Sequence, residues 1–402
     1  MRSIVAVTNE IDDVQAAVAE LQDQIMAQGG AGKNSCGIVY CDVEMPHEDF
    51  MRAIKEKLPF EVIGCTTIAS FDTNNGATIL SAVLILLTGD DVKFGVSLTG
   101  PLTSENLRKE LETACKAAED VLGEHGKLMF LMPPYENTVP LDEYVNILSE
   151  FSGNLPIFGG LPSSSVADGE IFMYADGRVF GDRAAILLIG GDVRPVFSVQ
   201  NFLSELSEQK YIVTSAEKNI VRKVGDMTFV DFLKHLGLPA DDLIAHGDMT
   251  VYASTPLKVY MSMKDERDKI PIARTIKELN PEDGSGVLFG EISEKSAVTI
   301  VTMKRKDIVN SCKAAMAEIT EKINAASGDD YKYSTLFCVS CGGRYLVMGD
   351  DKDTEGDVIT KQLPQGISLS GFYAYGEICP TLIENGKALN RVHNESIVMC
   401  AM

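Results

Sequence analysis

The sequence predicts an α/β protein of two domains, with mixed sheets and degenerate internal strand-helix-strand repeats. Short apolar runs, typical of buried strands, alternate with amphipathic segments of helical period along most of the chain. This order recurs three times, in copies of roughly a hundred residues, near the usual size of a domain. Such alternation implies strands joined by helical crossovers in sheets that are mostly buried.

The first copy covers residues 3–88. A helix is expected from Asn9 or Asp12 onward, because apolar residues at helical spacing follow it until Gly29 and Gly30. A second helix is expected at His47–Leu58. The apolar runs predict strands at Ser3–Val7, Ser35–Val43, Glu61–Gly64 and Ser81–Leu87.

The second copy covers residues 92–190 and repeats this order. Ser104 is expected to cap a helix whose apolar positions include Leu107, Leu111 and Cys115. Leu141–Phe151 is the second expected helix. The predicted strands are Val92–Leu98, Lys127–Met132 and Pro156–Gly160, followed by a hairpin over Ile171–Gly190.

The third copy is expected at residues 297–401, after an irregular segment at 191–296. Its predicted helices are Asp307–Ala325 and Thr354–Gln362. Its predicted strands are Ala297–Met303, Thr335–Ser340, Ile367–Phe372 and Glu395–Cys400. We expect the first two copies to form a domain over residues 1–198, and the irregular segment with the third copy to form a domain over 199–402.

The composition narrows the class of protein. The 58 acidic and 36 basic residues give a formal charge of −22, which disfavours nucleic acid and anionic membranes as partners. No apolar run approaches the length of a membrane-spanning helix, and the first residues do not resemble a signal peptide. The nine cysteines are scattered and lie in apolar surroundings, as in a protein of the reducing cytoplasm. We therefore expect a cytoplasmic protein that does not insert into membranes.

Metal-site motifs are incomplete. Cys338 and Cys341 have the CxxC spacing, but no second CxxC and no neighbouring histidine pair completes a set of four ligands. The pair ends a strand and meets two glycines, whereas a redox CxxC opens a helix. The five histidines form no HExxH or HxH pattern. His246 and His393 lie beside polar turns and are the two worth testing as ligands.

Two stretches carry the strongest signal for a site. In Leu336–Arg344 (LFCVSCGGR) a guanidinium follows an apolar strand and two glycines, and in Gly366–Thr381 (GISLSGFYAYGEICPT) Glu377 follows a run of glycines and aromatic residues. Arg344 is suited to bind a carboxylate with two nitrogens, and Glu377 to bind an ammonium group, as in an amino-acid-like ligand. An internal Arg344–Glu377 salt bridge explains the same residues equally well. An enzyme with Cys341 as nucleophile is the other alternative, and the absence of an evident histidine base counts against it.

At these residues the sequence resembles the FIST family of sensory domains, found in bacterial signalling proteins. The resemblance rests on LFCVSCGGR, on GFYAYGEICPT and on HNES at His393–Ser396, together with the stretch Ile272–Ile292. In the first half of the chain, Phe158–Gly160 (FGG) and Val179–Gly191 also match the family pattern. The family's Gly-x-Ser-Thr-x-Gly-Glu is incomplete here, since Gly64–Ser70 lacks the Gly-Glu.

The resemblance implies a sensor that binds a small ligand and signals through a separate output protein, because no output domain is recognisable in the chain. The resemblance also leaves open a haem-binding nitric-oxide sensor, with His246 or His393 as the haem ligand, and we otherwise expect no cofactor. Together, the residue chemistry and the resemblance favour a binding protein over an enzyme. The predicted ligand-binding residues are Cys341, Arg344, Gly371, Tyr373, Tyr375, Glu377, Asn394 and Arg274.

Overall fold

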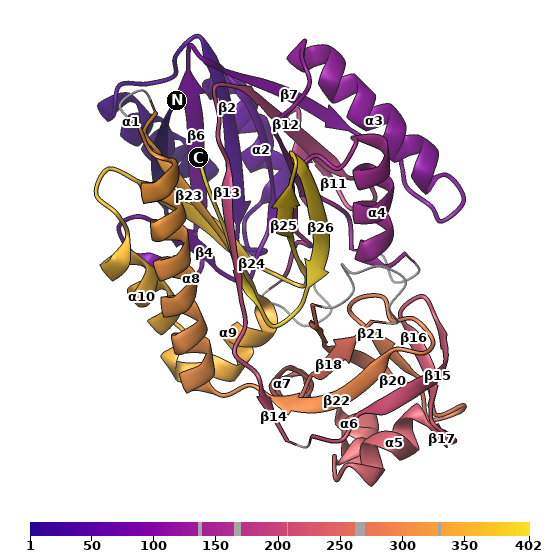
Figure 1. The fold of residues 1–402 in the computed structure, drawn as a ribbon. Helices are drawn as coiled ribbons and strands as arrows, with labels where there is room; N and C mark the ends of the chain where they lie inside the picture. Colours follow the sequence, from indigo (N-terminus) through magenta and orange to yellow (C-terminus); the bar gives the residue numbers. More distant parts are fainter. Residues whose placement is uncertain (136–138, 165–169, 207, 262–269, 329–330) are drawn as a thin grey trace.

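The computed structural model describes residues 1–135, 139–164, 170–206, 208–261, 270–328 and 331–402. It confirms the predicted α/β class with mixed sheets. A body holds three six-stranded sheets, and residues 204–303 form a smaller lobe around a fourth sheet (Figure 1). Both chain termini lie in the upper part of the body in Figure 1, and the lobe lies below it.

The first sheet is covered by α1 (Val14–Ala27) and α2 (His47–Lys57). The side chain of Asp13 accepts a hydrogen bond from the Ala16 N–H and so caps the start of α1. Apolar residues at helical spacing then bury one face of α1 against the sheet. In spatial order the strands are β1 (Arg2–Thr8), β6 (Ala82–Gly89), β2 (Asn34–Cys41), β3 (Glu61–Thr66), β10 (Met173–Ala175) and β11 (Arg178–Phe180).

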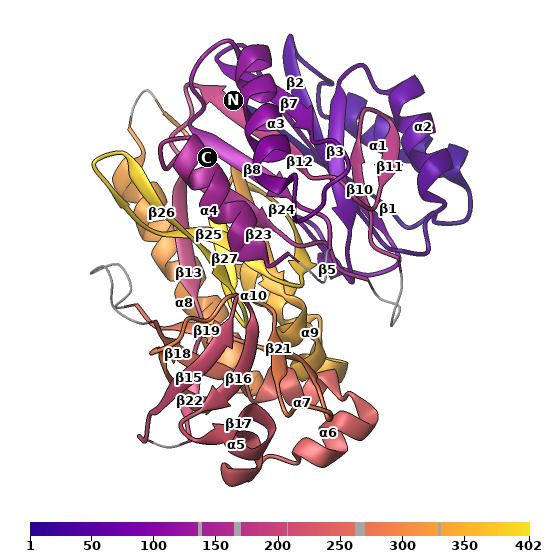
Figure 2. The ribbon, with the colours of Figure 1, turned by 90° about the vertical axis from the view of Figure 1, so that its right-hand side faces the viewer.

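The second sheet is covered by α3 (Leu107–Leu122) and α4 (Leu141–Phe151), which are seen from outside in Figure 2. α3 ends at Gly123, which adopts the left-handed conformation (φ 73°) that favours glycine. In spatial order the strands are β26 (Lys387–His393), β25 (Glu377–Glu384), β9 (Ile157–Gly160), β8 (Leu128–Met132), β12 (Ala185–Gly191) and β7 (Val92–Leu98).

The third sheet is covered by α8 (Arg305–Ala326) and α10 (Thr354–Gln362). The short helix α9 (Gly342–Met348) follows its central strand directly. In spatial order the strands are β13 (Val196–Gln200), β27 (Ile397–Ala401), β23 (Thr335–Cys341), β24 (Ser368–Ala374), β4 (Ser70–Asp72) and β5 (Gly76–Thr78).

The three sheets of the body share one pairing pattern. In each, an outer strand is antiparallel to a second, the second is antiparallel to a third, and the third is parallel to a fourth. The parallel pairs are β2–β3, β8–β9 and β23–β24. A hairpin from another part of the chain then completes each sheet: β10–β11 pairs with β3, β25–β26 with β9, and β4–β5 with β24. The three units thus exchange their hairpins in a cycle.

One apolar core joins the three sheets. It contains aromatic rings from each unit: Tyr40 from the first, Phe130 from the second, and Phe337 and Phe372 from the third. The ring centroids of Tyr40 and Phe372 lie 4.8 Å apart, and those of Phe130 and Phe337 lie 5.2 Å apart. Burial of such rings contributes strongly to stability, so this shared core holds the three sheets together.

The lobe has an apolar core of its own, which includes Val221, Phe229, Leu257 and Val298. Three short helices pack on its sheet: α5 (Phe229–His235), α6 (Ala240–His246) and α7 (Met249–Ser254). Its strands are β14 (Ser204–Glu205), β15 (Tyr211–Glu217), β16 (Ile220–Val224), β17 (Met227–Thr228), β18 (Leu257–Tyr260), β19 (Ile272–Arg274), β20 (Ile276–Leu279), β21 (Gly286–Leu288) and β22 (Ala297–Thr302). In the part of the chain described, no helix has the length and apolarity needed to cross a membrane.

The third predicted copy needs a correction. The expected strand Ala297–Met303 exists as β22, but it pairs within the lobe. The first strand of the third sheet is β13, so the lobe is inserted between β13 and α8. The prediction was wrong because β13 and β22 are both short apolar runs. Pairing with distant strands decides which of the two joins the third sheet. The repeat itself stays a prediction, which a superposition of the three units would test. The domain boundary at 198/199 also stays a prediction, and it falls within β13.

Each of the three parallel strand pairs has a glycine at the matching position, and the same steric constraint requires it in all three. Gly64, Gly159 and Gly371 each lie opposite a carbonyl group of the neighbouring strand. A Cβ atom built on these glycines would lie 1.9, 2.1 and 1.8 Å from the carbonyl oxygens of Val39, Leu131 and Cys338 respectively. No side chain fits at such distances, so strand packing alone requires glycine at 371.

We therefore predict that Gly371→Ala destabilises the protein by about 1–3 kcal/mol, because the two strands must separate to admit the methyl group. Gly181→Ala is the matched control, since the nearest atom to its Cβ lies 4.0 Å away. Urea unfolding followed by circular dichroism compares the two variants. Equal stability of both would contradict this account of Gly371.

Candidate functional site

A buried acidic cluster lies where three segments of the third unit meet. Cys341 ends β23, Glu377 begins β25, and Glu395 follows β26. Both carboxyl groups are completely buried. The Glu377 Oε2 atom accepts a hydrogen bond from the Ser396 N–H (3.1 Å), and the Glu395 Oε1 atom accepts one from the Thr275 hydroxyl (2.6 Å). Among the described residues, Glu377 Oε1 and Glu395 Oε2 have no hydrogen-bond partner.

Burial and the closeness of the two carboxyl groups both disfavour their ionisation. Burial raises the pKa of Glu377 well above its ordinary value, and the charge of Glu395 raises it further. Burial also raises the pKa of Glu395, to about 7. The pair therefore retains a proton at neutral pH. Gly343 makes room for it, because a Cβ atom there would lie 2.5 Å from Glu395 Oε1.

The Cys341 thiol is buried beside the two acids. Burial raises the pKa of the Cys341 thiol well above its ordinary value, and the carboxylates of Glu377 and Glu395 add to the effect. In place of the expected strand end followed by two glycines, Cys341 is the residue that precedes the first turn of α9. A helix start favours a thiolate, but here burial and two acids outweigh it. These surroundings therefore favour the neutral thiol over the thiolate.

Arg344 lies in a second buried cluster, and its ionic partner is Glu355 rather than Glu377. Its Nη2 atom lies 2.7 Å from Glu355 Oε1, and both side chains are at most 1% exposed. The guanidinium also donates to the Ser340 and Ser311 hydroxyls and to the Ile308 carbonyl. Glu355 was not foreseen, because a lone acid in the first turn of a helix gives no sign that it faces the core.

The remaining predicted residues of the third unit are spread over these clusters. The Tyr373 hydroxyl donates to Glu355 Oε2 (3.1 Å) and belongs with Arg344. The Asn394 Oδ1 atom accepts a hydrogen bond from the Thr275 N–H (3.4 Å) and lies beside the acidic cluster. The half-buried Tyr375 donates to the Ser164 carbonyl, and its ring centroid lies 6.2 Å from that of Phe289 of the lobe, with the two rings tilted by 44°. Gly371 lies within its sheet, for the packing reason given above.

Arg274 of the lobe forms an ion pair and a hydrogen bond with the body. Its Nη2 atom lies 2.8 Å from Asp142 Oδ1 of α4, and its Nη1 atom donates to the Val392 carbonyl of β26 (3.0 Å). The next residue, Thr275, donates to Glu395 as described above. The lobe and the acidic cluster are therefore connected directly. Asp142 was not foreseen, since its contact with Arg274 spans 132 residues of sequence.

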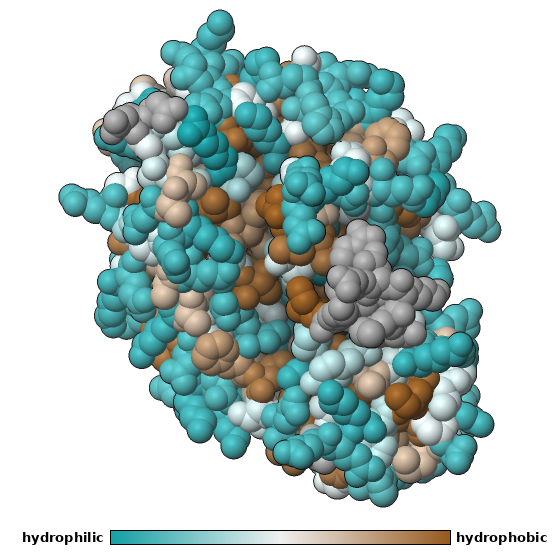
Figure 3. All heavy atoms as spheres, viewed as in Figure 1, coloured by the Kyte–Doolittle hydropathy of each residue, from teal (hydrophilic) through white to brown (hydrophobic). Residues whose placement is uncertain are grey.

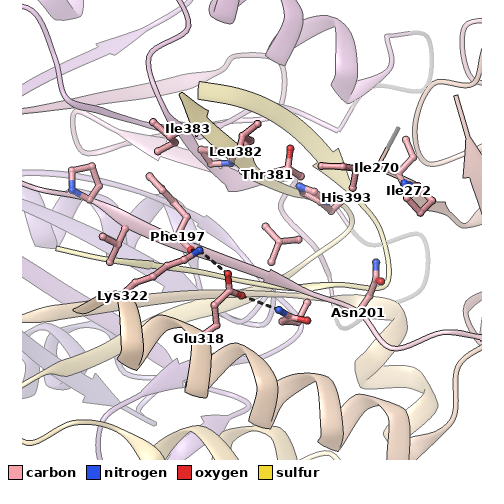
Figure 4. A pocket seen from close by; sticks show the side chains of 16 residues that line it. Phe197, Asn201, Ile270, Ile272, Glu318, Lys322, Thr381, Leu382, Ile383 and His393 are labelled. Atoms are coloured by element: carbon pink, nitrogen blue, oxygen red, sulfur yellow. Dashed lines mark hydrogen bonds and ion pairs between the residues drawn. The ribbon is translucent and has the colours of Figure 1, made fainter. Parts of the chain in front are cut away.

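Three cavities lie along the seam between lobe and body, and each is lined by both. A polar cavity of about 280 Å³, here called the Arg274 cavity, lies between Arg274 and Glu291 of the lobe and Asp142 and Arg391 of the body. A groove of about 500 Å³ lies between Ile270 of the lobe and β13, β25 and α8 of the body (Figure 4). The third, smaller cavity is lined by Tyr135 of the body and Lys277 of the lobe, among others.

The Arg274 cavity contains groups of both charges. The Nε atom of Arg274 donates to the Glu291 carbonyl, and the Glu291 N–H donates to Asp142 Oδ2 (both 2.9 Å). Burial raises the pKa of the Glu291 carboxyl to about 7, with a further contribution from the charge of Asp142. A cation beside Glu291 would relieve this cost. The cavity is therefore suited to a small molecule that carries an ammonium group.

The two histidines proposed as haem ligands do not fit that role well. His393 is buried, its Nε2 atom lies 3.1 Å from the Cys379 carbonyl, and burial lowers its pKa to about 4. Because a carbonyl only accepts, Nε2 is the protonated nitrogen and is not free to bind iron. His246 is exposed at the end of α6 and lines none of the cavities above.

The comparisons with known proteins identify the family. The FIST N domain matches residues 35–227, and the FIST C domain matches residues 231–380. The chain therefore belongs to the FIST family, whose members are generally sensory domains of signal transduction that are thought to bind small ligands. No curated protein matches. Among solved structures, the chain is similar to cyanuic acid hydrolase from A. caulinodans, with 9% identity, 99% of each chain covered and a TM-score of 0.35.

The buried Arg344–Glu355 pair gives a first prediction for this site. Glu355→Gln should lower the free energy of unfolding by about 3–5 kcal/mol, because it leaves a buried guanidinium without its counter-charge. The double variant Arg344→Met, Glu355→Gln should lose less than this single change. As a control, Asp351→Asn in the exposed pair with Arg305 should cost at most about 1 kcal/mol. Additive losses in a urea-unfolding double-mutant cycle would exclude the pair as the stabilising interaction.

A second prediction concerns Glu395. Its folded pKa of about 7 exceeds the ordinary 4.5, so between these values the folded state holds a proton that the unfolded state releases. Stability should fall as pH rises from about 4.5 to 7, by on the order of 3 kcal/mol relative to Glu395→Gln. Burial lowers the pKa of His393 from 6.5 to about 4, so this residue adds a dependence of opposite sign over much of the same window, and the comparison with Glu395→Gln removes it. The exposed Glu321→Gln should keep the wild-type pH dependence, and the account fails if Glu395→Gln keeps it too.

Proposed function

We propose that this protein is a cytoplasmic sensor that binds an amino-acid-like small molecule between its lobe and its body. The observation that carries the proposal is that the Arg274 cavity is lined by residues of both parts. A ligand that contacts both parts favours one arrangement of the lobe over others, which is the physical requirement for a signal. Membership of a sensory family supports the same function.

The charges of the cavity support an amino-acid-like ligand. The carboxyl group of Glu291 would receive the ligand's ammonium group. Arg274 would receive the carboxylate, since one of the two Nη2 hydrogens is not used by the contacts to Asp142 and the backbone. A volume of about 280 Å³ suits a ligand of this size.

Movement of the lobe would carry the signal to a separate output protein. Two of the contacts between lobe and body, from Arg274 to Asp142 and from Thr275 to Glu395, lie at the cavity and at the acidic cluster. The cytoplasmic location is supported by the nine cysteines, all free and buried. An enzyme that uses Cys341 is disfavoured by the raised pKa of its thiol.

We predict that at least one amino acid raises the melting temperature of the wild-type protein. Glu291→Gln should weaken its binding about ten- to a hundredfold, because a buried charge-assisted hydrogen bond is lost. Wild-type affinity should also fall below pH 7, where Glu291 becomes protonated, and the variant should lose this dependence. Glu282→Gln, on the exposed side of the lobe, is the control. Thermal shift and calorimetry at pH 6 and 8 measure these effects. If no amino acid binds, or if both variants behave alike, the proposal is wrong.

A further inference from the structure

The groove of about 500 Å³ beside β13 lies apart from the Arg274 cavity and has a different chemistry. Its floor comes from β13 and α8, and its opposite wall from β25 and from residues 270–272 of the lobe (Figure 4). In Figure 3 apolar residues, shown in brown, gather in the middle of this face of the molecule. The groove thus combines an apolar wall with a charged floor.

The apolar wall exposes large side chains. Leu382 and Ile383 on β25 are 41% and 42% exposed, and Ile270 on the other side is 45% exposed. Single exposed apolar side chains are common on protein surfaces, but a group of them that lines one cavity is typical of a binding site. The apolar part of a ligand would cover them.

The charged floor consists of Lys322 and Glu318, one turn apart on α8. The ammonium group of Lys322 lies 2.6 Å from Glu318 Oε1 and 2.7 Å from the Phe197 carbonyl. The other oxygen, Glu318 Oε2, accepts from the Ser198 hydroxyl (2.6 Å) and from the Gln200 amide (2.8 Å). Figure 4 shows both charged side chains turned toward the groove.

Counting hydrogen bonds favours an anion. An ammonium group has three N–H donors, and the contacts of Lys322 with described residues use two. Lys322 is also the more exposed member of the pair, at 45% against 33% for Glu318. The carboxylate of Glu318, by contrast, already receives three donors on its two oxygens. An anion can add to Lys322 without breaking a contact.

We propose that this groove binds a small carboxylate with an apolar chain, of about six to eight carbons. The carboxylate would lie at Lys322, and the chain would cover Leu382, Ile383 and Ile270. A cavity of this size is within the usual range for small ligands. Ile272 of β19 lines the groove, and the same strand carries Arg274. A ligand in the groove would therefore contact the segment that joins the lobe to the body.

Calorimetric titration of the full chain with octanoate, hexanoate, octanol and octylamine tests the proposal, at concentrations below micelle formation. Octanoate should bind at least tenfold more tightly than octanol or octylamine. Hexanoate should bind roughly fifteenfold more weakly than octanoate, because each methylene group contributes about a factor of four. If octanol or octylamine binds as tightly as octanoate, or if octanoate does not bind, the proposal is overturned.

Variants locate the site. Lys322→Met should weaken octanoate binding at least tenfold, Lys322→Arg should retain most of it, and Leu382→Ser should weaken octanoate and octanol alike. Lys361→Met is the matched control, since Lys361 pairs with Asp357 one turn away on α10, outside the groove. Unchanged octanoate binding by Lys322→Met, with its folded state verified by circular dichroism, would rule out the groove. Loss of amino-acid binding in Glu291→Gln leaves this outcome unaffected, so the two proposals fail separately.

Discussion

The exchange of hairpins between units is the constraint on which the rest of the structure depends. Each sheet of the body is completed by a hairpin from another unit, so none of the three is complete without its neighbours. This exchange pairs Glu377, the first residue of β25, with Gly160 of the second unit. The turn after the same hairpin places Glu395 on Gly343. The buried acidic cluster is therefore a consequence of how the units interlock.

The inserted lobe packs on the body as a separate part with its own sheet. It has its own core, and it reaches the body through Arg274 and Thr275 at the edge of the same cluster. The cavities along this seam are shared between the two parts, so a ligand there contacts both. The body supplies a rigid reference because its three sheets share one apolar core.

The fold class and most elements followed from apolar periodicity, because strands such as β6 and β12 are buried runs with clear limits. The family followed from the resemblance of the motifs LFCVSCGGR and GFYAYGEICPT. The assignment of β22 to the third copy was wrong, because the apolar sequence of a strand does not indicate which strand it pairs with. For the site, the motifs led to Cys341, Glu377 and Arg274, but the partners Glu395, Glu355 and Asp142 come from distant elements. Charge pairing between such elements depends on packing, which a single sequence does not encode locally.

The central claim is that the ligand binds between lobe and body. Hydrogen–deuterium exchange of the full chain, with and without an amino acid that stabilises it, tests this most directly. The account predicts slower exchange in β19 and the end of β26, the segments that line the Arg274 cavity from its two sides. Slower exchange confined to other elements, with these segments unchanged, would contradict it.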